Sequence, residues 1–146
     1  METIAIERSV WIAAPRERAW QAVTEPQHLD QWYATYYRWD IPALRVGAPV
    51  KFYGKDANTQ SDIQLAMIEV VDPPRQFTLR WHSNPELVTT FRLEEENGGT
   101  RATITESGYE AVPDDERQAW VDSTDKGYTM SMENLKAYLE GRSIPF

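Results

Sequence analysis

The sequence contains no cysteine among its 146 residues, and this absence excludes disulfide bonds, thiol nucleophiles and thiolate metal sites. No stretch approaches the roughly 20 consecutive apolar residues that a helix needs to span a bilayer. The first residues, METIAIERSV, are charged and strand-like, and they lack the long apolar segment of a signal peptide. From these absences we expect a cytoplasmic protein that has no membrane as a partner.

Positive charge is also scarce. The chain has 15 Lys and Arg residues against 23 Asp and Glu residues, which gives a formal net charge of -8. A surface of this charge repels phosphate backbones and anionic lipids. We therefore do not expect nucleic acid as a partner.

Several motifs that commonly carry chemistry are missing as well. The sequence has no phosphate-cradling glycine loop, no HExxH zinc signature and no GxSxG nucleophile turn. The two histidines, His28 and His82, lie far apart and lack the spacing of metal ligands. We expect neither a metal site nor a cofactor.

Apolar and aromatic residues, in contrast, are plentiful. A hydrophobic fraction of 41% with 26% charged residues is typical of a soluble globular protein, and the length suits one domain, residues 1–146, with a sizeable core. Aromatic residues make up 12% of the chain and include six tryptophans. Core packing explains most of them, but aromatic side chains also line apolar pockets.

Much of the chain shows the period-2 alternation of β-strands. In residues 3–12, Ile4, Ile6, Val10 and Ile12 share one face, which Arg8 interrupts. Pro15 and the Glu25-Pro26 step then indicate two short helices. Further strands are predicted at residues 36–40, 50–54, 62–71, 77–82, 87–94 and 100–109, with a hairpin turn at Asn97-Gly98-Gly99.

A long helix is predicted from about residue 114 to residue 140, after Pro113 and before Gly141. It would be roughly 40 Å long, enough to cross a small domain. Its apolar or small residues recur at helical spacing, at Trp120, Thr124, Gly127, Tyr128, Ser131, Met132, Leu135, Tyr138 and Leu139. Gly127 costs the helix about 1 kcal/mol relative to alanine, so it indicates either close packing against a strand or the wall of an internal cavity.

The order of elements is therefore strand, two short helices, six strands and a long helix. Consecutive strands with short turns favour an antiparallel meander. We expect an α+β domain in which a curved antiparallel sheet of about seven strands wraps around the C-terminal helix.

Local stretches in this order resemble the START-like helix-grip superfamily (SRPBCC). The closer similarity is to the small bacterial, single-domain form of the family named for the activator of the heat-shock protein 90 ATPase. The matching stretches are Val10 to Pro15 running into Ala19-Trp20, Thr24 to Pro26 with Trp32, Glu69 to Pro74, Trp81, Gly98 to Arg101, Gly127-Tyr128 and Leu135 to Glu140. Two positions depart from the family pattern: Tyr128 stands where tryptophan is usual, and Leu65-Ala66-Met67 stands where glycine is common.

The resemblance implies a cavity between the sheet and the long helix. Proteins of this superfamily range from lipid carriers to cyclases and co-chaperone domains, so the fold alone does not give the function. We predict a ligand-binding cavity lined by Trp32, Tyr33, Tyr36, Phe52, Leu79, Trp81, Phe91, Ile104, Glu106, Trp120, Thr124, Gly127, Tyr128 and Ser131. If Trp81, Phe91, Trp120 and Met132 filled that space themselves, this prediction would fail.

Glu106 is the most informative polar candidate. It continues the inward face of Ala102 and Ile104, where a carboxylate is costly unless it is paired or hydrogen-bonded. One interpretation is an ion pair with Arg8 or Arg92, or exposure at the end of the strand. The other is a polar anchor for a ligand or a proton acceptor with a raised pKa.

Three functions follow from these observations. The first is a non-catalytic protein that binds a small lipophilic or aromatic molecule in the cavity. The second is a chaperone-regulating or stress-response protein, whose partner would be a chaperone. The third is an enzyme of the cyclase, dehydratase or hydrolase kind that uses Glu106. For the assembly we expect a monomer or a homodimer.

Overall fold

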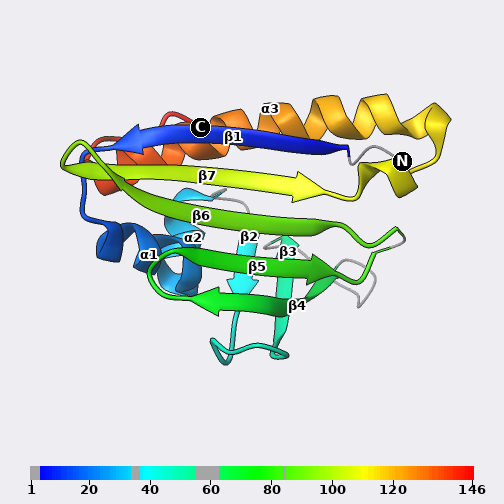
Figure 1. Ribbon diagram of the computed structural model, residues 1–146, viewed down its shortest axis with the longest axis horizontal. Helices are drawn as coiled ribbons and strands as arrows, with labels where there is room; N and C mark the ends of the chain where they lie inside the picture. Colours follow the sequence, from blue (N-terminus) through cyan, green and yellow to red (C-terminus); the bar gives the residue numbers. More distant parts are fainter. Residues whose placement is uncertain (1–3, 34–36, 55–62, 84) are drawn as a thin grey trace.

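The computed structural model describes residues 4–33, 37–54, 63–83 and 85–146. Its sheet has seven strands, all antiparallel to their neighbours, in the order β1-β7-β6-β5-β4-β3-β2 (Figure 1). The strands are β1 (Ala5–Ile12), β2 (Tyr37–Asp40), β3 (Pro49–Gly54), β4 (Ile63–Asp72), β5 (Gln76–Trp81), β6 (Val88–Glu96) and β7 (Gly99–Ser107). Strands β2 to β7 thus form a meander, and the last of them, β7, pairs with the first strand, β1. The predicted curved antiparallel sheet is confirmed.

The helices also occupy their predicted places. α1 (Arg16–Thr24) and α2 (Pro26–Trp32) follow β1, and α3 (Asp114–Leu139) is the long C-terminal helix, which runs alongside β1 (Figure 1). A short 3-10 helix that was not predicted, η2 (Tyr109–Ala111), connects β7 to α3. The helix-grip architecture expected from the sequence is therefore present.

The turn between β6 and β7 has the backbone that its sequence predicts. Asn97 and Gly98 have φ angles of 49° and 78°, which are the positive values that a two-residue type I′ hairpin requires. Glycine follows at position 99, where an added Cβ would lie 2.3 Å from the carbonyl oxygen of Ile12. The hairpin thus fixes the register between β6 and β7, and with it the face on which each side chain lies.

Among the described residues, one hydrophobic core lies between the inner face of the sheet and the helices. Along β7, buried and partly exposed residues alternate from Thr100 to Ser107, as period-2 geometry requires. Residues of all these elements join the core, among them Ile12, Val23, Leu29, Trp32, Val50, Ile68, Leu79, Leu93, Ile104, Leu135 and Leu139.

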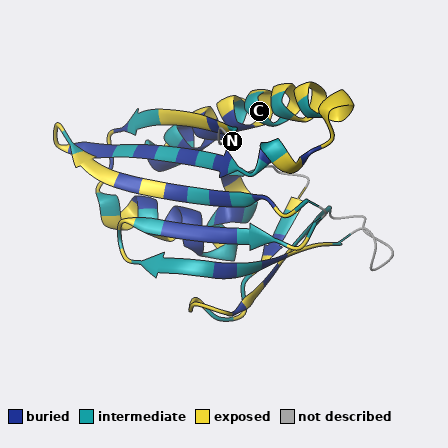
Figure 2. Ribbon diagram, turned by 45° about the vertical axis from the view of Figure 1, so that its right-hand side comes forward, coloured by how far each residue is buried: buried dark blue, intermediate teal, exposed yellow. Residues whose placement is uncertain are grey.

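Only part of α3 belongs to this core. Its buried residues begin at Tyr128 and continue to Leu139, whereas residues 114–116 and 118–120 are exposed (Figure 2). The part of α3 before Tyr128 is thus not packed into the hydrophobic core.

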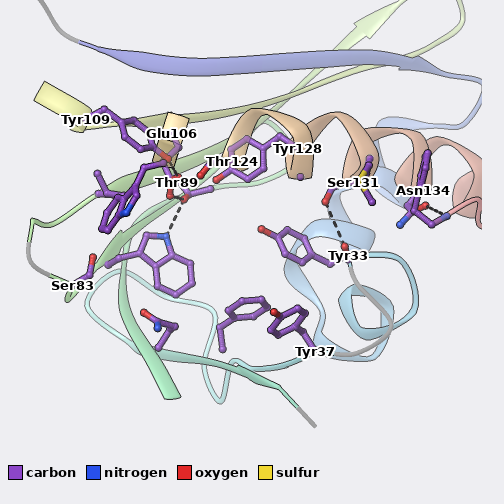
Figure 3. A pocket seen from close by; sticks show the side chains of 18 residues that line it. Tyr33, Tyr37, Ser83, Thr89, Glu106, Tyr109, Thr124, Tyr128, Ser131 and Asn134 are labelled. Atoms are coloured by element: carbon purple, nitrogen blue, oxygen red, sulfur yellow. Dashed lines mark hydrogen bonds between the residues drawn. The ribbon is translucent and has the colours of Figure 1, made fainter. Parts of the chain in front are cut away.

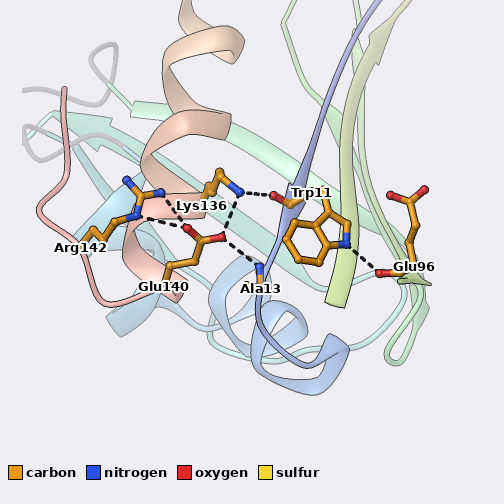
Figure 4. A network of polar contacts seen from close by, with 6 residues as sticks. All are labelled: Trp11, Ala13, Glu96, Lys136, Glu140 and Arg142. Carbon is orange, nitrogen blue, oxygen red and sulfur yellow. Dashed lines mark hydrogen bonds and ion pairs between the residues drawn. The ribbon is translucent and has the colours of Figure 1, made fainter. Parts of the chain in front are cut away.

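The C-terminal end of α3 is fastened to the end of β1 by polar contacts (Figure 4). Glu140 accepts a hydrogen bond from the backbone N–H of Ala13 at 3.0 Å and contacts Lys136 and Arg142. Lys136 Nζ in turn donates to the carbonyl oxygen of Trp11 at 2.6 Å. These contacts hold the helix in position along the sheet edge.

Candidate ligand-binding cavity

A cavity of about 670 Å³ lies between the sheet and the middle of α3, from Trp120 to Asn134 (Figure 3). Its walls come from nearly every element of the fold, from the residue after α2 to the C-terminal tail. The lining residues are Tyr33, Tyr37, Phe52, Gln64, Trp81, Ser83, Leu87, Thr89, Glu106, Tyr109, Trp120, Thr124, Gly127, Tyr128, Met130, Ser131, Asn134 and Phe146.

Glu106 forms the polar end of this cavity. It lies on the inner face of β7, is only 8% exposed, and is the cross-strand partner of Thr89 on β6. Thr89 Oγ1 donates to Glu106 Oε1 at 3.0 Å, and the Tyr109 hydroxyl donates to Glu106 Oε2 at 2.5 Å. Figure 3 shows Thr124 and Tyr128 of α3 beside this group. The carboxyl group is therefore buried but hydrogen-bonded.

The hydrogen bonds around Glu106 run in one direction. Trp81 Nε1 donates a hydrogen bond to Thr89 Oγ1 at 2.9 Å, and the Thr89 hydroxyl in turn donates a hydrogen bond to Glu106. Because an indole N–H donates only, it fixes the order of this chain from Trp81 to the carboxylate. Glu106 is the acceptor at which the chain ends.

Burial raises the pKa of Glu106, whereas hydrogen bonds from Tyr109, Thr89 and Tyr128 oppose the rise. Burial likewise raises the pKa values of Tyr33, Tyr109 and Tyr128, and the nearby carboxylate adds to this effect. The tyrosines are thus neutral hydrogen-bond donors at neutral pH. Chemically, the group can accept a hydrogen bond or a proton from a molecule in the cavity.

The ion pair with Arg8 or Arg92, which was one of the two interpretations of Glu106, is not formed. Arg8 instead donates from Nε and Nη2 to the two carboxylate oxygens of Asp125 on α3, each at 2.6 Å, and Arg92 is exposed. Arg8 lies where β1 runs beside α3, so its long side chain reaches the helix surface and pairs with Asp125 there. Glu106 is satisfied by hydroxyl groups instead.

Aromatic rings form another part of the wall. Tyr37 stacks on Phe52 with ring centroids 4.9 Å apart, and the Tyr33 ring meets Phe52 edge-on at 5.7 Å. The Trp81 ring lies 6.1 Å from Phe52, so Trp81 connects this cluster to the Glu106 group. The cavity therefore combines aromatic walls with one carboxyl group.

Gly127 shows why α3 carries small residues. A Cβ at this position would meet nothing within 4 Å, so no strand packs closely against the backbone there. Of the two interpretations left open by the sequence, the structure matches the cavity wall. Thr124 and Ser131, one turn before and after it, also line the cavity.

The structure brings together nine of the fourteen residues predicted to line the cavity: Tyr33, Phe52, Trp81, Glu106, Trp120, Thr124, Gly127, Tyr128 and Ser131. Tyr36 lies outside the described residues. The other four, Trp32, Leu79, Phe91 and Ile104, belong to the hydrophobic core instead.

Those four residues lie deeper than predicted, inside the packed core between the sheet and the helices. Leu79 and Ile104 are 0% exposed, and Phe91 stacks on Phe77. Trp32 is also 0% exposed, and its Nε1 donates to the carbonyl oxygen of Ala22 at 2.7 Å. Inward orientation was correctly inferred for these strands, but depth along each strand was not.

Sequence reasoning missed nine lining residues: Tyr37, Gln64, Ser83, Leu87, Thr89, Tyr109, Met130, Asn134 and Phe146. Leu87 and Thr89 share an alternating face with Phe91, so strand periodicity contains a signal for them. Phe146 reaches the cavity because its backbone N–H donates to Asn134 Oδ1 at 3.1 Å. No sequence pattern indicates that this tail folds back.

The sequence matches the model of the family described as Activator of Hsp90 ATPase homolog 1-like protein over residues 13–140. The chain belongs to this family. The match spans most of the chain, from the end of β1 to the end of α3, and so includes every strand that lines the cavity. No curated protein matches the sequence.

Solved structures of similar proteins agree with the fold of this family member. Protein MLL2253 from Mesorhizobium loti is 23% identical with a TM-score of 0.75, and the match covers 97% of this chain and 99% of that one. The Aha1 dimer from Colwellia psychrerythraea is 19% identical with a TM-score of 0.72, covering 94% and 96%. Protein BH1534 from Bacillus halodurans is 22% identical with a TM-score of 0.75, covering 95% and 99%. At these identities the likeness establishes the fold alone.

Among the described residues, no helix has the length and apolar character needed to cross a membrane.

Proposed function

We propose that this family member binds a small, largely apolar molecule in the cavity between the sheet and α3, with Glu106 as its polar anchor. The observation that carries the proposal is a cavity of about 670 Å³ whose aromatic walls enclose one buried, hydrogen-bonded carboxyl group. Ligand pockets in proteins typically have volumes of about 300 to 1,000 Å³ and combine apolar walls with a few convergent polar groups.

The four large side chains that could have filled the cavity leave its volume open. Phe91 and Met132 are core residues, 2% and 3% exposed. Trp81 and Trp120 lie in the cavity wall, and Trp120 is 39% exposed near its edge. The remaining volume is open to a ligand.

Native mass spectrometry of the purified protein tests the proposal. We expect a small molecule that remains bound under native conditions and is released on denaturation. A Gly127→Leu variant, whose side chain projects into the cavity, should lose this molecule. The matched control is Ser123→Leu, an exposed position on the same helix that does not line the cavity.

If the Gly127→Leu and Ser123→Leu variants retain the same molecule equally, it is bound elsewhere and the proposal is wrong. If no molecule co-purifies, titration with naphthyl probes, in which binding is measured by the change in the protein's tryptophan fluorescence, provides the second test. Failure of every probe to bind would also reject the proposal.

A second candidate function is regulation of a chaperone, and membership of the family favours it. A similar protein from Colwellia psychrerythraea is described as an Aha1 dimer, so a homodimer is part of this second proposal. A direct test is the rate of ATP hydrolysis by a purified Hsp90-type chaperone with and without this protein. An unchanged rate over a broad range of concentrations would reject the second candidate.

A further inference from the structure

We propose that the ligand is an apolar molecule carrying a protonated amine, that the ammonium group contacts Glu106, and that carboxylate-bearing molecules such as fatty acids are excluded. This inference rests on the proposed ligand-binding function and defines the chemical class of the ligand.

The charges in the cavity wall are the first argument. Among the described lining residues Glu106 is the only acid, and none is lysine, arginine or histidine. An anionic ligand would therefore lose its hydration without gaining a cationic partner, and it would lie near a carboxyl group. An ammonium group would instead provide Glu106 with the cationic partner that the described lining residues do not supply.

The direction of the hydrogen bonds is the second argument. Trp81 donates to Thr89, Thr89 donates to Glu106, and Tyr109 donates to the other oxygen of Glu106. An ionised carboxylate offers about four acceptor positions, so Thr89, Tyr109 and the third donor, Tyr128, do not saturate it. Because the surrounding groups already donate, the group that fits the remaining positions is another donor.

The aromatic walls are the third argument. Trp81 donates a hydrogen bond to Thr89, the residue that donates to Glu106, and the Trp81 ring also contacts Phe52, on which Tyr37 stacks. A cation within about 6 Å of an aromatic face is attracted by the ring quadrupole, most strongly by tryptophan. The same walls accommodate the apolar part of the ligand. A net charge of -8 also raises the concentration of cations near the protein.

The groups that face Glu106 predict how binding depends on pH. They are Thr89 on β6, Tyr109 on η2, Thr124 and Tyr128 on α3, and Tyr33 after α2. None of these is a cation, and the tyrosines stay neutral at neutral pH. Glu106 is thus the group that titrates beside the ligand below pH 7, and affinity for an amine should fall as pH decreases and Glu106 becomes protonated.

Calorimetric titration of the intact protein near pH 7 with three probes of matched size provides the test: naphthylethylamine, naphthylethanol and naphthylacetate. We expect the amine to bind about tenfold more tightly than the alcohol and the carboxylate to bind most weakly. Glu106→Gln should reduce amine affinity about tenfold and leave alcohol affinity nearly unchanged. Thermal unfolding of the variant checks that it is folded.

Three results would overturn the inference: a carboxylate that binds as tightly as the amine, an alcohol that binds as tightly as the amine, or a Glu106→Gln variant with unchanged amine affinity. In each of these cases the cavity still binds an apolar ligand, so that part of the proposed function survives, whereas an unchanged Glu106→Gln variant also removes Glu106 as the polar anchor. If none of the three probes binds, the inference and the proposed function fail together. Gly127→Leu, which should block all three probes, shows whether the measured binding takes place in the cavity.

Discussion

The Tyr109 hydroxyl lies 2.5 Å from Glu106 Oε2, although the two residues belong to different elements, η2 and β7. Gly108 between them has a φ of 107°, a left-handed conformation that side chains rarely adopt, and an added Cβ would lie 3.0 Å from the carbonyl oxygen of Glu86. This turn brings the hydroxyl back over the strand that it has just left. The hydrogen bond at the polar end of the cavity is thus produced by a local turn.

Removing that hydroxyl should make Glu106 a weaker acid. The hydrogen bond from Tyr109 lowers the pKa of Glu106 against the effect of burial, so Tyr109→Phe removes a stabilising contact to the ionised form. We expect the pKa of Glu106 to rise further, measured by NMR titration of the side-chain carboxyl carbon. Tyr53→Phe on β3, which does not line the cavity, is the control. An unchanged or lower pKa in Tyr109→Phe would contradict the assigned contact.

Glu106 should also make the protein less stable as pH rises. Its pKa is raised in the folded state above the ordinary value of 4.5, so the folded protein holds a proton that the unfolded chain releases. The favourable contribution is therefore present below pH 4.5 and is lost as pH rises through the folded-state pKa. Urea unfolding should show wild type losing stability relative to Glu106→Gln across this range. If the stability difference between wild type and Glu106→Gln stays constant with pH, the pKa of Glu106 is not raised in the folded protein.

The sequence predicts the face of a residue better than its depth. Period-2 alternation correctly placed Glu106, Ile104 and Phe91 on the inner side of the sheet, because each strand alternates strictly. It did not separate Ile104 and Phe91, which the core covers, from Glu106, which meets the cavity. That distinction depends on where α3 crosses the sheet, which is a property of the assembled fold.

Partners of polar groups were harder still to predict. Arg8 and Glu106 share a face, yet Arg8 contacts Asp125, which is 117 residues away in the chain. Tyr109, three residues from Glu106 in the sequence, was not predicted as its partner because the position of Tyr109 depends on the left-handed turn at Gly108. Helix periodicity, in contrast, located Trp120, Gly127 and Tyr128 on the cavity wall.

Glu140 should stabilise the folded state at neutral pH and lose this effect in acid. The backbone N–H of Ala13, then Arg142 and Lys136, hold the pKa of its carboxyl at about 2, below the ordinary 4.5. A lowered pKa gives stability that is present above pH 4.5 and is lost as pH falls toward 2. We expect Glu140→Gln to cost about 1 kcal/mol near pH 7 and much less near pH 2.

Urea unfolding at the two pH values measures this effect, and Glu133→Gln is the control because Glu133 is exposed on the same helix. If Glu140→Gln and Glu133→Gln lose equal stability at neutral pH, the contacts of Glu140 do not fasten α3 to β1. A loss by Glu140→Gln that persists unchanged in acid would show that its cause is packing and not charge.

Gly127 should be kept for the cavity at the expense of helix stability. Glycine within a helix is about 1 kcal/mol less favourable than alanine, and a Cβ at this position meets nothing within 4 Å. We therefore expect Gly127→Ala to raise the free energy of unfolding by about 1 kcal/mol, measured by urea unfolding. Ser123→Ala, at an exposed position of the same helix, controls for helix propensity alone. Because the added methyl group projects into the cavity, Gly127→Ala should weaken ligand binding while stabilising the protein, whereas Ser123→Ala should leave binding unchanged.

If Gly127→Ala instead destabilised the protein, a neighbouring group would have to lie close to the helix at this position. The wall would then be more tightly packed than a cavity allows.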